Sequence, residues 1–178
     1  MIHFSTDCVF DGSSGPYDEG SQTSPIDAYG KTKALGEVSD GAALTIRSSF
    51  IGRELYDKSE LLEWFLNSDS AAGFTGVFYS GVSTIFLSTV ISSIVEQHPG
   101  LSGLYQLAAP EPIAKYDLLV HAQRAFAWQG KLTEDNSVSS MPTLDGSKLQ
   151  QIVGYSVPDW GIMMDELANF KMPAKVAT

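Results

Sequence analysis

Tyr29 and Lys33 stand four residues apart in the segment Tyr29-Gly30-Lys31-Thr32-Lys33. On a helix, residues at this spacing share one face and lie one turn apart. A phenol has an ordinary pKa of about 10, and an ammonium group a few ångströms away lowers that pKa by favouring the phenolate. The pair therefore suits proton transfer in the interconversion of a carbonyl and an alcohol. The motif alone is weak, because an ordinary exposed helix can contain the same two residues.

Strand and helix signals alternate around this pair. Short apolar runs predict strands at 1–4, 42–46 and 104–108, and a loop rich in Gly, Ser, Pro and Asp occupies 11–25. Apolar residues at helical spacing predict helices at 27–38, 59–67, 84–97, 113–128, 146–154 and 158–170. This alternation predicts an α/β fold with a parallel sheet.

Composition and charge argue against several classes of function. The formal net charge of −10 argues against nucleic-acid binding, which needs a basic surface. Cys8 is the single cysteine, so an intramolecular disulfide and a multi-cysteine zinc site are both excluded. No apolar run approaches the roughly 20 residues of a membrane span, and a secretory signal pattern is absent. We therefore expect a cytoplasmic protein that binds neither nucleic acid nor membrane.

Several motifs in a fixed order make the Tyr-x-x-x-Lys match specific. The chain resembles the dTDP-4-dehydrorhamnose reductase family of extended short-chain dehydrogenases/reductases, strongly to residue 50 and loosely beyond it. The motifs are Ser5 to Gly12 (STDCVFDG), Pro16 to Glu19 (PYDE), Tyr29 to Glu37 (YGKTKALGE), Thr45 to Phe50 (TIRSSF), Gly81 to Thr84 (GVST) and Gly103 to Leu107 (GLYQL).

The resemblance implies an α/β fold that corresponds to the carboxyl-terminal part of such a reductase. We expect a partial Rossmann-like parallel sheet with a small α/β substrate lobe. Within a single partial domain, 1–178, the catalytic part spans 1–58, and the remaining sheet, helices and substrate-binding lobe span 59–178. The glycine-rich turn that holds the cofactor pyrophosphate in this family is absent, so on the order of 100 upstream residues are expected to be missing.

The resemblance also implies roles for individual residues. Tyr29 matches the tyrosine that protonates the reduced carbonyl oxygen, Lys33 the lysine that lowers its pKa, and Thr6 the hydroxyl that binds the carbonyl. The implied catalytic residues are thus Thr6, Tyr29 and Lys33. The implied cofactor-binding residues are Ser5, Tyr29, Lys33 and Ser48. The implied substrate-binding residues are Thr6, Val9, Phe10, Phe50 and Thr84.

The implied function is NADP- or NAD-dependent reduction of a 4-keto nucleotide-linked deoxysugar, as in dTDP-rhamnose and polysaccharide biosynthesis. Two alternatives remain open. A nucleotide-sugar epimerase or dehydratase uses the same Tyr and Lys, and the lack of the glycine-rich motif favours a non-catalytic binding or regulatory module. A homo-oligomer is expected, because a sheet without its upstream strands leaves the edge at Ile2 to Ser5 unpaired.

Overall fold

The computed structural model describes residues 1–38, 40–54 and 59–171 of the chain. At its centre, three parallel strands pair in the order β1-β2-β6. They are β1 (Ile2–Ser5), β2 (Leu44–Arg47) and β6 (Gly103–Gln106). All three strands end at the same edge of the sheet, with Ser5 opposite Arg47 and Arg47 opposite Gln106. The predicted parallel α/β sheet is therefore confirmed.

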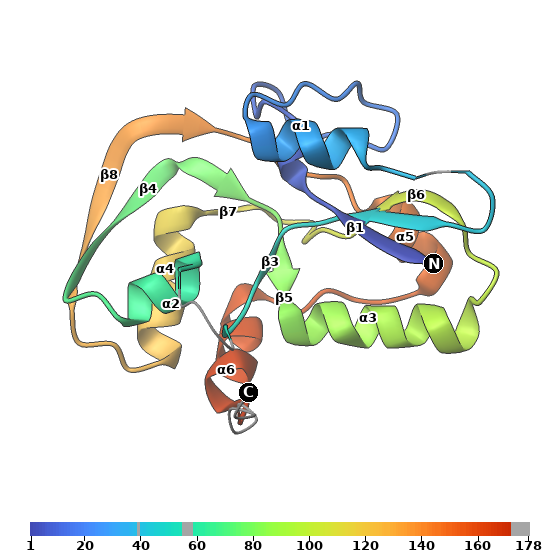
Figure 1. Cartoon of the computed structure of the whole chain (residues 1–178). Coiled ribbons are helices and arrows are strands. Elements are labelled where there is room, and N and C mark those ends of the chain that lie inside the picture. The colour runs from blue at the N-terminus through green and yellow to red at the C-terminus, as the bar shows by residue number, and fades with distance from the viewer. Residues whose placement is uncertain (39, 55–58, 172–178) are drawn as a thin grey trace, which may run out of the picture.

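Two helices cover opposite faces of this sheet (Figure 1). Helix α1 (Ala28–Leu35) lies on one face and helix α3 (Thr84–Gln97) on the other. The α3 side is an ordinary apolar core, in which Leu44 and Ile46 of β2 pack with Val90 of α3. Because side chains alternate across a strand, the neighbours of Leu44 and Ile46 in β2 face α1 instead.

The face under α1 is polar and holds a buried ion pair. The Arg47 Nε and Nη2 atoms each donate a hydrogen bond of 2.7 Å to the carboxylate of Glu37, just beyond the carboxyl end of α1. Ser5 donates a third bond of 2.7 Å to the same carboxylate, and the Arg47 guanidinium also lies over the Phe10 ring. Burial alone raises the pKa of Glu37, but the bonds from Arg47 and Ser5 outweigh burial and hold that pKa below its ordinary value.

A second sheet, in the order β7-β4-β8, forms a separate lobe with two helices (Figure 1). Strands β4 and β8 are parallel, whereas β4 and β7 are antiparallel. The lobe consists of α2 (Leu61–Leu66), β4 (Ser70–Tyr79), β7 (Ile113–Ala114), α4 (Lys115–Ala125) and β8 (Lys131–Ser140). Phe65 of α2 packs against Trp128 within this lobe, with tilted rings whose centroids lie 4.3 Å apart.

Strands β3 (Phe50–Ile51) and β5 (Val82–Ser83) pair in parallel as a third, two-stranded sheet. The remaining elements are η1 (Asp7–Val9), α5 (Ser147–Val153) and α6 (Trp160–Asn169). Among the described helices, none is both long and apolar enough to cross a membrane.

The predicted and observed elements differ mainly in the second lobe. Strands β4 and β8 were not predicted, and the predicted helix 113–128 divides into β7 and the shorter α4. The expected boundary between the two parts of the chain, at residue 58, falls outside the described residues. The observed second sheet and its helices agree with the expected small α/β lobe.

We expect the Arg47–Glu37 pair to stabilise the fold strongly. Arg47→Leu leaves the partly buried Glu37 carboxylate without its partner, which costs at most about 3–5 kcal/mol of the free energy of unfolding. The double variant Arg47→Leu/Glu37→Leu is expected to lose less, because no charge remains buried. Arg124→Leu is the matched control, since the Arg124–Asp165 pair is exposed and is worth no more than about 1 kcal/mol.

Urea unfolding at neutral pH and near pH 4 measures these differences. Because the folded pKa of Glu37 is lowered, the pair stabilises the native state above the ordinary pKa of 4.5 and loses that contribution as the pH falls through the folded value. The Arg47→Leu deficit should therefore shrink in acid. Equal losses for Arg47→Leu and Arg124→Leu at neutral pH contradict the prediction.

Candidate active site

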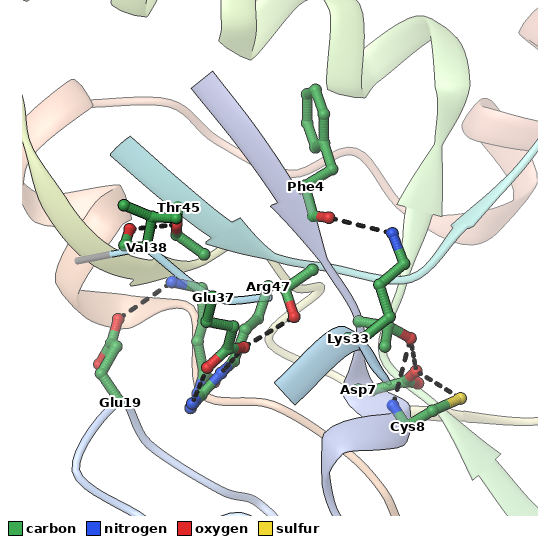
Figure 2. A network of polar contacts seen from close by, with 12 residues as sticks. Phe4, Asp7, Cys8, Glu19, Lys33, Glu37, Val38, Thr45 and Arg47 are labelled. Atoms are coloured by element: carbon green, nitrogen blue, oxygen red, sulfur yellow. Dashed lines mark hydrogen bonds and ion pairs between the residues drawn. The ribbon is translucent and has the colours of Figure 1, made fainter. Parts of the chain in front are cut away.

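The site begins where β1 ends, at Thr6 and Asp7. The Thr6 hydroxyl is the N-cap of η1: its oxygen accepts a bond of 3.2 Å from the Cys8 amide and donates one of 3.0 Å to the Asp7 carboxylate (Figure 2). Both side chains are buried, with exposed fractions of 5% for Thr6 and 7% for Asp7. A polar pair is thus fixed at the carboxyl edge of a parallel sheet, where ligands bind in open α/β folds.

Helix α1 brings Tyr29 to this edge. Asp27 caps the helix by accepting a bond of 2.7 Å from the Gly30 amide, which defines where the first turn starts. Gly30 packs directly against the Cys8 carbonyl, and any side chain there would overlap that oxygen. The absence of a Cβ at Gly30 therefore allows the first turn of α1 to approach η1, and Tyr29 comes close to the Thr6 hydroxyl.

The Tyr29 phenol is neutral in this environment. Burial raises its pKa, the nearby Thr6 hydroxyl partly offsets that rise, and the negative charges of Asp7 and Glu60 add to it. The side chain is still 54% exposed, so its hydroxyl is accessible from solvent. At neutral pH the site therefore presents a protonated phenol, which is the form that donates a proton.

The pKa of Tyr29 is raised, with burial as the largest cause, and the expectation that Lys33 lowers this pKa stays a prediction. The Lys33 Nζ atom lies 5.8 Å from the centroid of the Tyr29 ring and donates a bond of 3.2 Å to the Phe4 carbonyl (Figure 2). The strand thus holds the ammonium group, and burial determines the direction of the shift. The i, i+4 spacing correctly placed Tyr29 and Lys33 on one face of α1. It could not predict that the Phe4 carbonyl of β1 accepts a hydrogen bond from Lys33.

Ser5 and Ser48, predicted to bind cofactor, have hydroxyls engaged within the fold. Ser5 donates to Glu37, and Ser48 lies at the end of β2 and donates a bond of 2.8 Å to the Leu107 carbonyl. Both residues are buried. Their assigned roles stay predictions, and in this structure their hydroxyls stabilise the sheet edge.

The predicted substrate residues beyond Thr6 are scattered. Val9 and Phe10 are buried at 0% and 2% exposure, so a contact with substrate has to involve their backbone atoms. Phe50 is 52% exposed on β3, and Thr84 begins α3 with its side chain against Gly52. The structure therefore gathers Thr6, Tyr29 and Lys33, but it does not show Phe50 or Thr84 in contact with them.

Two residues near the site have no role in the sequence prediction. Asp7 was recognised in the sequence only as the last residue of the Ser-Thr-Asp motif. Tyr79 lies on a strand that was not predicted, so no sequence pattern marked it. The negative charge of Asp7 acts on both Tyr29 and Tyr79. Within the described ranges, no group of His, Cys, Asp and Glu side chains could hold a metal ion.

The expected contacts of Lys33 and Tyr29 with the ribose and nicotinamide of a cofactor stay predictions. The glycines of the 11–20 loop do not form a phosphate cradle, because Gly12 packs against Ser140 and Gly15 against Met141. Holding the remainder of a dinucleotide requires groups other than these glycines.

Known proteins match this chain in sequence and in fold. Residues 1–51 match the family model described as the RmlD substrate binding domain. The resemblance to the dTDP-4-dehydrorhamnose reductase family is confirmed. The dTDP-4-dehydrorhamnose reductase of Escherichia coli (strain K12) is 24% identical over 193 residues, which cover 95% of this chain and 64% of that protein. The crystal structure of a dTDP-4-dehydrorhamnose reductase from Clostridium acetobutylicum superposes with a TM-score of 0.79 at 21% identity, covering 93% of this chain and 64% of that one.

A relative with a different name matches over a similar range. Methionine adenosyltransferase 2 subunit beta from Xenopus tropicalis is 28% identical over 182 residues, which cover 89% of this chain and 54% of that protein. This chain thus spans about half the length of that relative.

The close approach at Gly30 gives a testable prediction. Gly30→Ala normally favours a helix by about 1 kcal/mol, but here the new methyl group overlaps the Cys8 carbonyl. We expect a net loss of about 1–3 kcal/mol in the free energy of unfolding, because backbone has to shift. Gly20→Ala is the matched control, since its nearest neighbour is a side-chain oxygen at 3.5 Å. Urea unfolding of both variants measures the effect, and a stabilised Gly30→Ala variant contradicts it.

Proposed function

We propose that this chain is the catalytic and substrate-binding part of a nucleotide-sugar reductase that reduces a 4-keto deoxysugar with NADPH or NADH. The observation that supports this most is the meeting of Thr6, Tyr29 and Lys33 at one edge of a parallel sheet, with the Tyr29 phenol protonated. The similarity to the E. coli and C. acetobutylicum reductases supports the same substrate class.

In this mechanism each residue has a separate task. The Thr6 hydroxyl, which the Cys8 amide holds in place, turns its proton from Asp7 to the substrate carbonyl oxygen and orients that oxygen. Tyr29 donates its phenolic proton to that oxygen as the ketone becomes an alcohol. The Lys33 ammonium stabilises the resulting phenolate and binds the nicotinamide ribose. A reduced nicotinamide, when bound, supplies the hydride.

The cofactor is proposed as NADP or NAD. A dTDP-4-dehydrorhamnose reductase from Bacillus anthracis, whose fold matches with a TM-score of 0.78, was solved in complex with NADP, and a dTDP-glucose 4,6-dehydratase from the same organism with NAD. We further propose that 1–58 and 59–178 act as the catalytic and lobe-forming parts of one unit, and that the protein forms a homo-oligomer.

One observation favours a second candidate, a non-catalytic subunit. The Xenopus relative is named as a subunit of methionine adenosyltransferase, and it matches across 89% of this chain. In that case the same edge of the sheet binds a nucleotide or nucleotide sugar without turnover. The Tyr29 hydroxyl then contributes only to the binding affinity, because no reaction takes place at the site.

The Tyr29→Phe variant distinguishes these two functions. Loss of a general acid costs about 10²–10⁴ in rate, so kcat for reduction of a 4-keto nucleotide sugar should fall at least about a hundredfold. Turnover is measured with NADPH and with NADH, in the chain itself and in a chimera that places the amino-terminal part of the E. coli reductase before Met1. Tyr105→Phe is the control, because Tyr105 is partly buried against the apolar core and its hydroxyl forms no hydrogen bond within the described residues.

Each outcome of this assay is informative. A large loss for Tyr29→Phe with a normal Tyr105→Phe supports the reductase. Near-full turnover by Tyr29→Phe shows that Tyr29 is not the proton donor. Tight nucleotide-sugar binding with no turnover in the unsubstituted chain or chimera favours the subunit function instead.

Thr6→Val tests the carbonyl contact. We expect kcat/KM to fall about tenfold, because one hydrogen bond to the reacting oxygen is worth about 0.5–1.5 kcal/mol. The free energy of unfolding should also fall by about 1 kcal/mol, since valine cannot cap η1. Thr6→Ser retains the hydroxyl and should keep most of both properties. Steady-state kinetics and urea unfolding are measured on the same preparations, and an unchanged kcat/KM for Thr6→Val excludes this role.

A further inference from the structure

Tyr79 is the last residue of β4, at the point where the second sheet meets the first. It lies opposite Ile113 of β7, and its ring packs against Trp160 of α6 with centroids 5.6 Å apart. These contacts from two elements fix the plane of the ring. The position of the hydroxyl is therefore set by the fold rather than by a free rotation of the side chain.

The Tyr79 hydroxyl reaches the edge of the first sheet. It lies over Gly81, where a methyl group would overlap both the Tyr79 hydroxyl and the Ser49 carbonyl. Ser49 follows β2 just as Thr6 and Asp7 follow β1, and the two strands are adjacent and parallel. The phenol therefore points toward the same edge as the proposed carbonyl-binding group.

The environment keeps this phenol neutral. Burial raises the pKa of Tyr79 well above its ordinary value, and the negative charge of Asp7 raises it further. A neutral phenol is a hydrogen-bond donor. Asp7, whose charge acts on Tyr79, also accepts the bond from Thr6.

The hydroxyl has no bonding partner within residues 1–38, 40–54 and 59–171. The hydrogen bonds formed among these residues do not include the Tyr79 oxygen, whereas the phenols of Tyr17 and Tyr155 each bond to the protein and those of Tyr29, Tyr105 and Tyr116 do not. What separates Tyr79 from Tyr105 and Tyr116 is the position of its hydroxyl beside the Ser49 carbonyl at the sheet edge. A fixed, neutral and unpaired donor at the sheet edge is suited to bind an oxygen of a ligand.

We infer that Tyr79 is a specificity-determining residue that donates a hydrogen bond to a sugar hydroxyl of the nucleotide-sugar substrate. The inference rests on the proposed function. Thr6 and Tyr29 are assigned to the carbonyl oxygen at carbon 4, so Tyr79 is assigned to the neighbouring oxygen at carbon 3. Its proton is not transferred, and the residue therefore affects affinity and choice of substrate rather than the rate of proton transfer.

The test is the Tyr79→Phe variant, which removes one oxygen and retains the ring that packs on Trp160. Calorimetric titration of the chain with the 4-hydroxy product nucleotide sugar needs no cofactor. We expect Kd to rise about tenfold, which corresponds to one hydrogen bond. With the analogue that lacks the 3-hydroxyl, the native chain and Tyr79→Phe should bind within about twofold of each other. Tyr105→Phe is the matched control and should leave both Kd values unchanged.

Kinetics and unfolding separate this role from the alternatives. In the active chain or chimera, KM should rise about tenfold while kcat changes less than about threefold. The free energy of unfolding should stay the same, because the hydroxyl forms no hydrogen bond with the residues that the structure describes. A loss of stability with unchanged Kd shows that the hydroxyl is structural and overturns the inference. A fall in kcat like that of Tyr29→Phe also overturns it.

The two proposals fail in different ways. If the native protein binds and reduces a 4-keto nucleotide sugar but Tyr79→Phe binds product and its 3-deoxy analogue as the native chain does, the specificity role is wrong and the reductase stands. If neither the native chain nor the chimera binds or reduces any nucleotide sugar, the proposed function is wrong, and the role of Tyr79 is excluded with it.

Discussion

The arrangement of the site depends on the buried ion pair between Arg47 and Glu37. Helix α1 has no apolar stripe facing the sheet, and Gly30 is its one buried residue. Hydrophobic burial therefore contributes little to its position, and the pair fixes the carboxyl end of α1 to β2 while Ser5 extends the contact to β1 (Figure 2). Isolated buried ion pairs often add little net stability, but they restrict geometry, because each charge tolerates few other positions. Here the restricted geometry is that of the helix containing Tyr29 and Lys33.

The polar face under α1 also explains why the first turn of that helix is precise. Three contacts define α1 along its length: the Asp27 cap, the approach of Gly30 to Cys8, and the bond from Lys33 to the Phe4 carbonyl. Each involves a backbone atom of the neighbouring segment or of the helix itself. Side-chain packing can relax when a residue changes, whereas backbone contacts shift the entire turn. A small displacement at any of these points therefore moves Tyr29 relative to Thr6.

The sequence predicted the first sheet and the chemistry at its edge because those features are local. Strand ends, a capped helix and an i, i+4 pair are all encoded within about 50 residues. The second sheet was missed for a physical reason: β4 contains Gly73 and Gly76, and β8 is a largely exposed run of polar residues, so neither shows strand periodicity. Each becomes a strand by pairing with the other along seven registered positions. Contacts that depend on this pairing, including the position of Tyr79, could not be predicted from local sequence.

The charges around Asp7 suggest how a weakly acidic phenol can still serve a reductase. Burial raises the pKa of Tyr29 and the negative charge of Asp7 adds to that rise, so the phenol is protonated before reaction. The same burial and charge oppose the phenolate that remains after the proton has left. Lys33 is the cation on the same helix face, and one bond to the Phe4 carbonyl leaves its other N–H groups free to turn toward Tyr29. Under the proposed function, these effects act at different stages: burial and Asp7 hold the proton on Tyr29 before reaction, and Lys33 stabilises the anion that forms when the proton is transferred.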